Sequence, residues 1–280
     1  MGYKTILSVL DNPKNAAQVT EFSIALAEQF GAHVVGLHSE AIAAIPLVAP
    51  MEIPDPSTVQ ALQEMAQEET QTIEKIFSER AKRNGTAYEW RSFVASAGLS
   101  SSSLIQSART ADLVVAAQGE NGSPTDNRAD LENFLFESGR PMLLIPYVLK
   151  QPKPIRKVMV AWNGSREATR ATYDALPFLK AADSVEVYCV SPGDKGGTER
   201  FVPGAAIATT LARHGVNVTV ETEEGDDMKA SVAIQNRLAD SGIDLLIMGA
   251  YTHQRWWEML FGGVTRTLLD SMTAMTLLSR

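Results

Sequence analysis

The stretch MGAYTHQRWWEMLFGGVTR, residues 248–266, joins an apolar, strand-like segment to a helical pattern. The apolar segment ends at Gly249, a loop follows, and Gly262-Gly263 precedes the helical pattern over residues 264–271. Two glycines before a helix leave its first backbone N–H groups uncovered, where the positive end of the helix dipole attracts an anion. Taken alone, the pair is more typical of a simple helix-entry turn. Whether the pair binds an anion therefore depends on where it lies in the fold.

The rest of the chain repeats this alternation of strand and helix, and the order of elements occurs twice. Strand-like runs fall at residues 5–10, 33–37, 88–94, 113–117, 142–146, 157–162, 185–190, 217–221, 245–248 and 275–278. Helical patterns fall at 15–30, 58–83, 100–109, 130–137, 167–180, 204–214, 228–241 and 264–271. The halves align as TILSVLD with KVMVAWN, ADLVVAA with IDLLIMG, and FESGRPMLLIP with LDSMTAMTLLS. This duplication predicts two domains, 1–149 and 157–280, joined by a polar linker at 150–156.

Strands that alternate with helices predict an α/β fold. Each half is expected to be a doubly wound, Rossmann-like domain, with a mostly parallel five-stranded sheet and helices on both faces. Such sheets bind ligands beyond the carboxyl ends of their strands, where the strand order reverses. That rule places Asp11 or Asn163, after the first strand of each half, and Gln118 or Gly249, after the fourth, at the ligand-binding edge.

Composition excludes several classes of protein. The net charge of -8 argues against a nucleic-acid partner, because such partners need a basic face. No apolar run reaches membrane-spanning length, and the first residues run directly into a strand-like segment, so we expect a cytoplasmic protein with no signal peptide and no membrane contact. Cys189, inside an apolar run, is expected to be a small core residue. Four histidines and one cysteine show no metal-ligand spacing.

Familiar nucleotide and nucleophile motifs are also missing. GDKGGT at 193–198 breaks the order of a P-loop, and no G-x-G-x-x-G follows a first strand. SAGLS at 96–100 lacks the first glycine of a nucleophile elbow. Asn163-Gly164-Ser165 is typical of a turn that caps a helix. These exclusions leave the turn at 163–165 and the glycines of 249–263 as the candidate site.

These two remaining features resemble the universal stress proteins. Nucleotide-binding members of that family carry G-x-x-G, nine residues, then Gly and Ser or Thr after the fourth strand, and an Asp ends their first strand. Here Gly249-Ala250-Tyr251-Thr252, nine residues, then Gly262-Gly263-Val264 have the same spacing. The resemblance covers almost the whole chain as two tandem repeats, and it implies the fold of the adenine nucleotide alpha-hydrolase-like proteins.

The resemblance implies that the second half binds ATP or another adenine nucleotide, with or without Mg²⁺. Thr252 stands where the family has its second glycine, and Asn163 replaces the Asp but can still hydrogen-bond a ribose or adenine. Gly263 replaces the Ser or Thr, and Thr265 could supply the hydroxyl. Adenine is expected near the end of the second strand, at Val190. The candidate binding residues are Asn163, Gly164, Ser165, Val190, Gly249, Thr252, His253, Gly262, Gly263, Val264 and Thr265.

Other residues of this loop have two interpretations each. His253 could contact phosphate, but an exposed loop histidine is more often inert. Arg255 and Arg266 are equally consistent with phosphate binding and with a solvated surface. Trp256-Trp257 is expected to pack over the sheet edge or a partner domain rather than to stack on adenine.

The first half departs further from the family pattern. It keeps Asp11, but its fourth strand ends in Gln118-Gly119 and no Gly-Gly precedes the next helix. Ala129 and Asp130 align with Gly262 and Gly263, and an aspartate at a helix N-terminus repels phosphate. We therefore expect the first half to be a pseudo-domain that does not bind nucleotide in the usual way.

The resemblance favours a cytoplasmic stress-response regulator without fast catalysis, since no general base or magnesium-binding carboxylate pair is evident. A nucleotide-free interaction scaffold of the same fold is the main alternative, and a slow nucleotide-hydrolysing enzyme is a more distant one. The final strands, 142–145 and 275–278, are expected to pair across domains or subunits. That pairing would give an intramolecular pseudo-dimer or a homodimer; the sequence names no protein partner.

Overall fold

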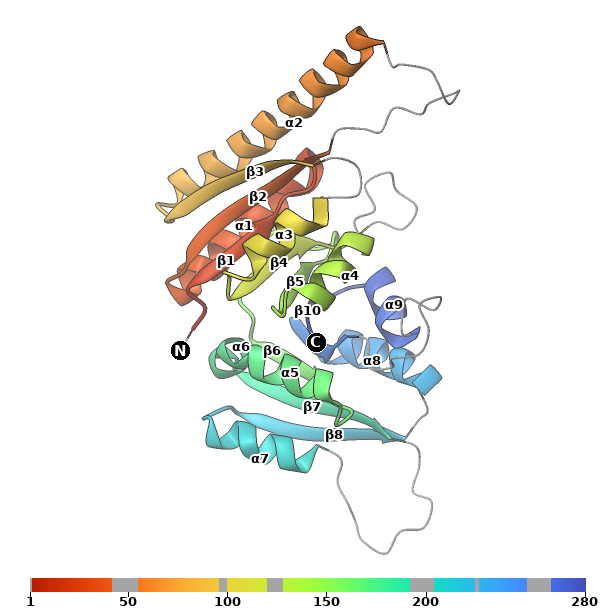
Figure 1. Cartoon of the computed structure of the whole chain (residues 1–280). Coiled ribbons are helices and arrows are strands. Elements are labelled where there is room, and N and C mark those ends of the chain that lie inside the picture. Colours follow the sequence, from red (N-terminus) through yellow and green to blue (C-terminus); the bar gives the residue numbers. More distant parts are fainter. Residues whose placement is uncertain are drawn as a thin grey trace, which may run out of the picture. The chain divides into compact units, whose positions relative to one another are not determined.

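The computed structural model describes residues 2–41, 55–95, 100–119, 128–191, 204–224, 227–250 and 263–280 (Figure 1). Within them, the order of strands and helices occurs twice. The first repeat is β1 Thr5–Val9, α1 Pro13–Phe30, β2 His33–Ala41, α2 Pro56–Arg83, β3 Tyr88–Ala95, α3 Ser100–Ala108, β4 Leu113–Ala117, α4 Arg128–Glu137 and β5 Met142–Ile145. The second is β6 Lys157–Ala161, α5 Arg166–Asp174, α6 Leu176–Ala181, β7 Ser184–Ser191, α7 Ala205–Arg213, β8 Val218–Glu224, α8 Asp227–Ser241, β9 Leu245–Gly249, α9 Gly263–Asp270 and β10 Met275–Ser279.

The chain divides into two compact units, and the unit of residues 2–138 has a parallel sheet in the order β3-β2-β1-β4. Strands β1 and β4 are almost wholly buried, as expected for short apolar runs in a sheet that is covered on both faces. Helix α1 packs with α2, and α3 packs with α4. Gly36 of β2 lets α2 approach closely, because a Cβ there would lie 2.7 Å from the ring of Phe77.

The unit of residues 139–280 has the strand order β5-β10-β9-β6-β7-β8. Its strands are parallel except β5, which pairs antiparallel with β10 through partners such as Leu143 and Leu277. The two final strands therefore pair, as the family resemblance implies. We expected five strands in each half. Because β5 joins β10, the compact units contain four and six of the described strands, and the division falls between Ser138 and Gly139.

One predicted helix is divided. The helical pattern over residues 167–180 forms α5 and α6, with Pro177 in the first turn of α6. Proline lacks the N–H that a continuous helix would need, so a new helix starts there. No helix in the described part of the chain is long and apolar enough to cross a membrane.

An aspartate fastens the first strand of each repeat to its fourth strand. Oδ2 of Asp112 accepts hydrogen bonds from the backbone N–H groups of Lys4 (2.7 Å) and Thr5 (3.0 Å). Oδ2 of Asp244 accepts the same pair of bonds from Arg156 and Lys157, each at 3.0 Å. The aligned segments ADLVVAA and IDLLIMG therefore have the same structural role in both repeats.

Candidate functional site

The sheet of the second unit reverses its strand order between β6 and β9. These strands are parallel neighbours, and Ala161 at the end of β6 pairs with Met248 near the end of β9. From β6 the chain adds β7 and β8 on one side, then returns to add β9 and β10 on the other. Ligands of doubly wound sheets bind at such a reversal. Asn163 follows β6 and Gly249 ends β9, so the structure brings these two predicted residues to one edge.

The turn after β6 is held by its own side chains. Oδ1 of Asn163 accepts a hydrogen bond from the N–H of Ser165 (3.1 Å), and Oγ of Ser165 accepts one from the N–H of Ala168 (3.1 Å). Ser165 is therefore the N-cap of α5, as the sequence indicated. Gly164 has a φ of 73°, the left-handed conformation that glycine adopts without strain. Within the described residues the amide nitrogen of Asn163 donates no hydrogen bond, so it can donate one to a ligand.

Gly249 has a packing role that the sequence did not reveal. A Cβ atom at this position would lie 2.4 Å from the backbone nitrogen of Ala168 and 2.5 Å from the carbonyl carbon of Glu167. Glycine is therefore required for α5 to begin directly against the end of β9. This contact also fixes the turn at 163–165 relative to β9.

Helix α9 begins at Gly263, one residue before the predicted start at Val264, so Gly263 is itself the first helical residue. Val264 and Thr265 follow in its first turn, where backbone N–H groups lack partners within the helix. The side chains of these two residues lie outside the described part of the structure. Thr252, His253 and Gly262 lie wholly outside the described part. Arg255 and Trp256-Trp257 lie outside it too, so their two interpretations stay predictions.

Val190 lies near the end of β7, beside β6 in the sheet, and pairs with Glu223 of β8. It is half buried. Cys189 beside it is buried, as predicted, and burial raises the pKa of its thiol to about 11. Such a thiol stays protonated at neutral pH and is a poor nucleophile.

Charged groups gather next to the turn at 163–165. Glu167 is buried in the first turn of α5, and its Oε1 accepts hydrogen bonds from Nε (3.1 Å) and Nη2 (3.0 Å) of Arg166. Arg280 follows β10 at the same edge; burial lowers the pKa of its guanidinium, and Glu167 and Arg166 act on it electrostatically. Arg166 and Arg280 therefore offset the charge of Glu167 beside this turn, while Glu223 and Glu224 lie at the end of β8, farther along the same edge of the sheet.

The corresponding edge of the first unit is built differently. Asn12, not Asp11, caps α1, because its Oδ1 accepts the N–H of Asn15 (3.1 Å). Helix α4 starts at Arg128, so Ala129 and Asp130 already belong to its first turn. Aligned from the last strand, α4 therefore begins two residues earlier than α9. The predicted lack of nucleotide binding in this half stays a prediction.

Sequence reasoning missed two buried polar residues near the end of β2. His38 is 4% exposed, and its Nδ1–H donates to the carbonyl oxygen of Leu10 (2.6 Å). Glu40 is 8% exposed and accepts a hydrogen bond from Oγ1 of Thr70 on α2 (3.2 Å). We expected the strand to end at residue 37. The alternation of Gly36, His38 and Glu40 toward α2 was the signal that could have extended it.

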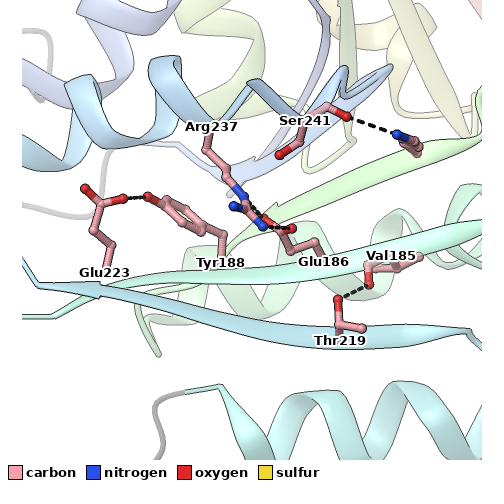
Figure 2. A network of polar contacts seen from close by, with 8 residues as sticks. Val185, Glu186, Tyr188, Thr219, Glu223, Arg237 and Ser241 are labelled. Atoms are coloured by element: carbon pink, nitrogen blue, oxygen red, sulfur yellow. Dashed lines mark hydrogen bonds and ion pairs between the residues drawn. The ribbon is translucent and has the colours of Figure 1, made fainter. Parts of the chain in front are cut away.

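A second polar network ties α8 to the sheet of the second unit (Figure 2). Nε and Nη2 of Arg237 donate to the two carboxylate oxygens of Glu186 at 2.8 Å and 2.6 Å, a bidentate pair. The hydroxyl of Tyr188 donates to Glu223 on the neighbouring strand. Burial, followed by the bond to Glu223, raises the pKa of Tyr188 above its ordinary value. The pair of Arg237 and Glu186 joins α8 to β7, and the bond between Tyr188 and Glu223 joins β7 to β8.

The described residues contain no group of three or more His, Cys, Asp or Glu side chains that could hold a metal ion. No protein-family model matches the chain. A curated universal stress protein of Synechocystis sp. is 28% identical over 157 residues, covering 55% of this chain and 49% of that protein. The match therefore spans about half the length of that relative.

Several solved structures match nearly the whole chain. One is a universal stress protein from Archaeoglobus fulgidus, with a TM-score of 0.70 at 16% identity, covering 98% of this chain and 96% of that one. Another is the cytoplasmic domain of a prokaryotic cation chloride cotransporter, with a TM-score of 0.50 at 12% identity and coverages of 98% and 94%.

The chain thus has a doubly wound α/β fold that occurs twice in tandem. It is the fold of the universal stress proteins. The resemblance to that family found in the sequence is confirmed, by the Synechocystis relative in sequence and by the A. fulgidus protein in fold.

Proposed function

We propose that this chain is a cytoplasmic stress-response regulator that binds an adenine nucleotide at the carboxyl edge of its second unit. The observation that carries the proposal is the position of the turn at 163–165 and of Gly249. They lie at the adjoining ends of β6 and β9, where the strand order reverses. The chain has the fold of the universal stress proteins and the glycine spacing of that family at this edge, and both support an adenine nucleotide as the ligand.

The residues of this edge suit an adenine nucleotide. The first backbone N–H groups of α9 would receive phosphate oxygens, because they are unpaired within the helix and lie at its positive end. The amide nitrogen of Asn163 would donate to a ribose hydroxyl or to adenine, and Val190 would contact the base. The buried carboxylate of Glu167 is already paired with Arg166, so its repulsion of a phosphate is reduced. We propose binding and regulation, with no fast hydrolysis.

A test is the nucleotide content and ligand response of the purified chain. On denaturation we expect it to release adenine nucleotide, identified by chromatography and absorbance. ATP, ADP or AMP at millimolar concentration, with and without Mg²⁺, should raise the melting temperature, since a ligand at 100 times its Kd adds about 2.7 kcal/mol of stability. GTP is the control for base selectivity. A chain that releases no nucleotide and shows no shift with any adenine nucleotide would refute the proposal.

A nucleotide-free interaction scaffold is the second candidate. One fold can serve different functions, and the fold matched over 98% of this chain also occurs in a cotransporter domain. The degenerate glycine motif of the first half also favours a scaffold. The same titration separates the two candidates, because a scaffold predicts an unchanged melting temperature in all nucleotides.

A further inference from the structure

A cavity of about 150 Å³ lies within the second unit, between helices α8 and α9 and strands β9 and β10. Helix α9 contributes Leu268 near its C-terminal end, and Met272 and Ala274 come from the turn that leads to β10. The candidate nucleotide site involves the opposite end of α9, which starts at Gly263. The cavity is therefore a separate feature of this unit.

Most of the cavity wall is apolar. Five of its apolar lining residues are buried, and Ala239 of α8 lies at the exposed rim. The apolar lining consists of Leu238, Ala239, Leu246, Leu268, Met272 and Ala274. An engineered apolar cavity of about 150 Å³ stays free of water and binds benzene. A ring of that size therefore fits the space available here.

One side of the cavity is polar and ordered. Nε2 of Gln235 donates to Oγ of Ser271 (2.5 Å) and to the carbonyl oxygen of Thr267 (3.3 Å). These two bonds use both amide hydrogens and tie α8 to the end of α9. Oε1 of Gln235 accepts no hydrogen bond from any residue in the described part of the chain. An amide oxygen fixed in this way is an acceptor for a ligand that carries one donor.

We propose that the cavity binds a small planar molecule, a single aromatic ring with one hydroxyl donor. The ring would occupy the apolar space, and its hydroxyl would donate to Oε1 of Gln235. Ligand sites commonly combine an apolar wall with a few fixed polar groups, and this arrangement has that form. The inference does not depend on nucleotide binding, because it rests on the other end of α9.

Phenol and toluene are probes of similar size and shape, in which a hydroxyl donor of the one replaces a methyl group of the other. In the full chain labelled with ¹³C-methyl methionine, both should move the Met272 signal, assigned with Met272→Leu, in a saturable titration. Transfer from water favours the methyl group of toluene, so the hydrogen bond is measured as a ratio: the affinity for phenol relative to toluene should fall about fivefold in Gln235→Leu, the usual gain from one neutral hydrogen bond. A Met272 signal that responds to neither probe would overturn the proposal.

Two variants and one matched control complete the test. Ala239→Phe places a ring at the rim, where it can enter the cavity, and should weaken phenol binding at least tenfold. Ala212→Phe introduces the same ring at an exposed position of α7, outside the cavity, and should leave binding unchanged. Gln235→Leu should weaken phenol binding, because the buried hydroxyl then has no acceptor, and should leave toluene binding nearly unchanged. An unchanged ratio of phenol to toluene affinity in Gln235→Leu, or equal losses in the two Phe variants, would contradict the site.

Discussion

Gly249 and Ala168 lie so close that a Cβ atom on the glycine would stand 2.4 Å from the backbone nitrogen of the alanine. Gly249 ends β9, and Ala168 lies in the first turn of α5. Glycine takes the same role in dinucleotide-binding folds, where it permits close packing of a helix on a strand. Gly249, the first glycine of the segment that resembles the family's G-x-x-G motif, is therefore needed for the packing of this unit, besides its proposed role beside a ligand.

Gly249→Ala should destabilise the chain by about 3 kcal/mol, because the added methyl group meets backbone that cannot move aside. Gly164→Ala is the control: a Cβ there meets nothing within 4 Å, so only the strain of its positive φ, about 1 kcal/mol, is expected. Urea unfolding of the two variants measures the difference. Equal losses of unfolding free energy in Gly249→Ala and Gly164→Ala would show that the structure around Gly249 accommodates the methyl group without a steric penalty.

Most strands could be predicted from apolar runs in the sequence. A parallel strand that is buried on both faces consists of consecutive hydrophobic residues, as in β4 and β9. Strand β2 was predicted too short, since His38 and Glu40 are polar, although both are buried and hydrogen-bonded, to Leu10 and to Thr70 of α2. The break between α5 and α6 was missed because the apolar period continues across Pro177. The pairing of β5 with β10 was expected from the family resemblance, not from the residues of either strand alone.

At the candidate site, the sequence predicted where the residues lie better than what they contact. The alternation of elements placed Asn163 and Gly249 at one edge, and the sheet order agrees. Their contacts could not be predicted in the same way. Ser165 was expected as a cap, but the use of Oδ1 of Asn163 within the turn and the fit of Gly249 against α5 depend on three-dimensional packing.

Nucleotide binding should depend on the glycines before α9 and not on their counterparts before α4. Gly262→Asp should abolish the thermal shift with ATP, because a carboxylate at the start of α9 repels phosphate and occupies its donors. Ala129→Asp makes the corresponding change in the first half and should leave the shift unchanged. Calorimetric titration of both variants is the measurement. Loss of binding in Ala129→Asp, or unchanged affinity in Gly262→Asp, would place the phosphates elsewhere.

Asp244 should support stability in a pH-dependent way. Burial alone would raise the pKa of its carboxyl, but hydrogen bonds from Lys153 and from the N–H groups of Lys157 and Arg156 outweigh burial and lower it. A lowered pKa in the folded state gives stability that is complete above the unfolded value of about 4 and is lost as the pH falls below it.

Asp244→Asn should therefore cost about 2 kcal/mol at pH 7, the usual range for hydrogen bonds to a charged group. Its difference from the unmodified chain should shrink as the pH falls below about 4, measured by urea unfolding across that interval. Lys153→Met, which removes a partner that is 48% exposed, should cost less than about 1 kcal/mol. A loss in Asp244→Asn that does not change with pH would mean that carboxylate charge is unimportant there.

Tyr188 should give the opposite pH dependence at alkaline pH. It is 3% exposed, and burial together with its hydrogen bond to Glu223 raises its pKa. A raised pKa in the folded state gives stability that is complete below the unfolded value of about 10 and is lost as the pH rises beyond it. Tyr188→Phe should cost about 1 kcal/mol at pH 8, where the lost hydrogen bond is the only change, and should reduce the fall in stability above pH 10.

The control for this prediction is Tyr173→Phe, which removes a hydroxyl from a side chain that is 42% exposed. It should leave both the stability at pH 8 and its alkaline fall close to those of the unmodified chain. Urea unfolding at several pH values gives the stabilities, and the ultraviolet absorbance of tyrosinate follows ionisation directly. If Tyr188→Phe kept the full alkaline loss, the Tyr188 hydroxyl would not be the group whose ionisation opposes folding. The Tyr188 side chain would then stabilise the fold through packing alone.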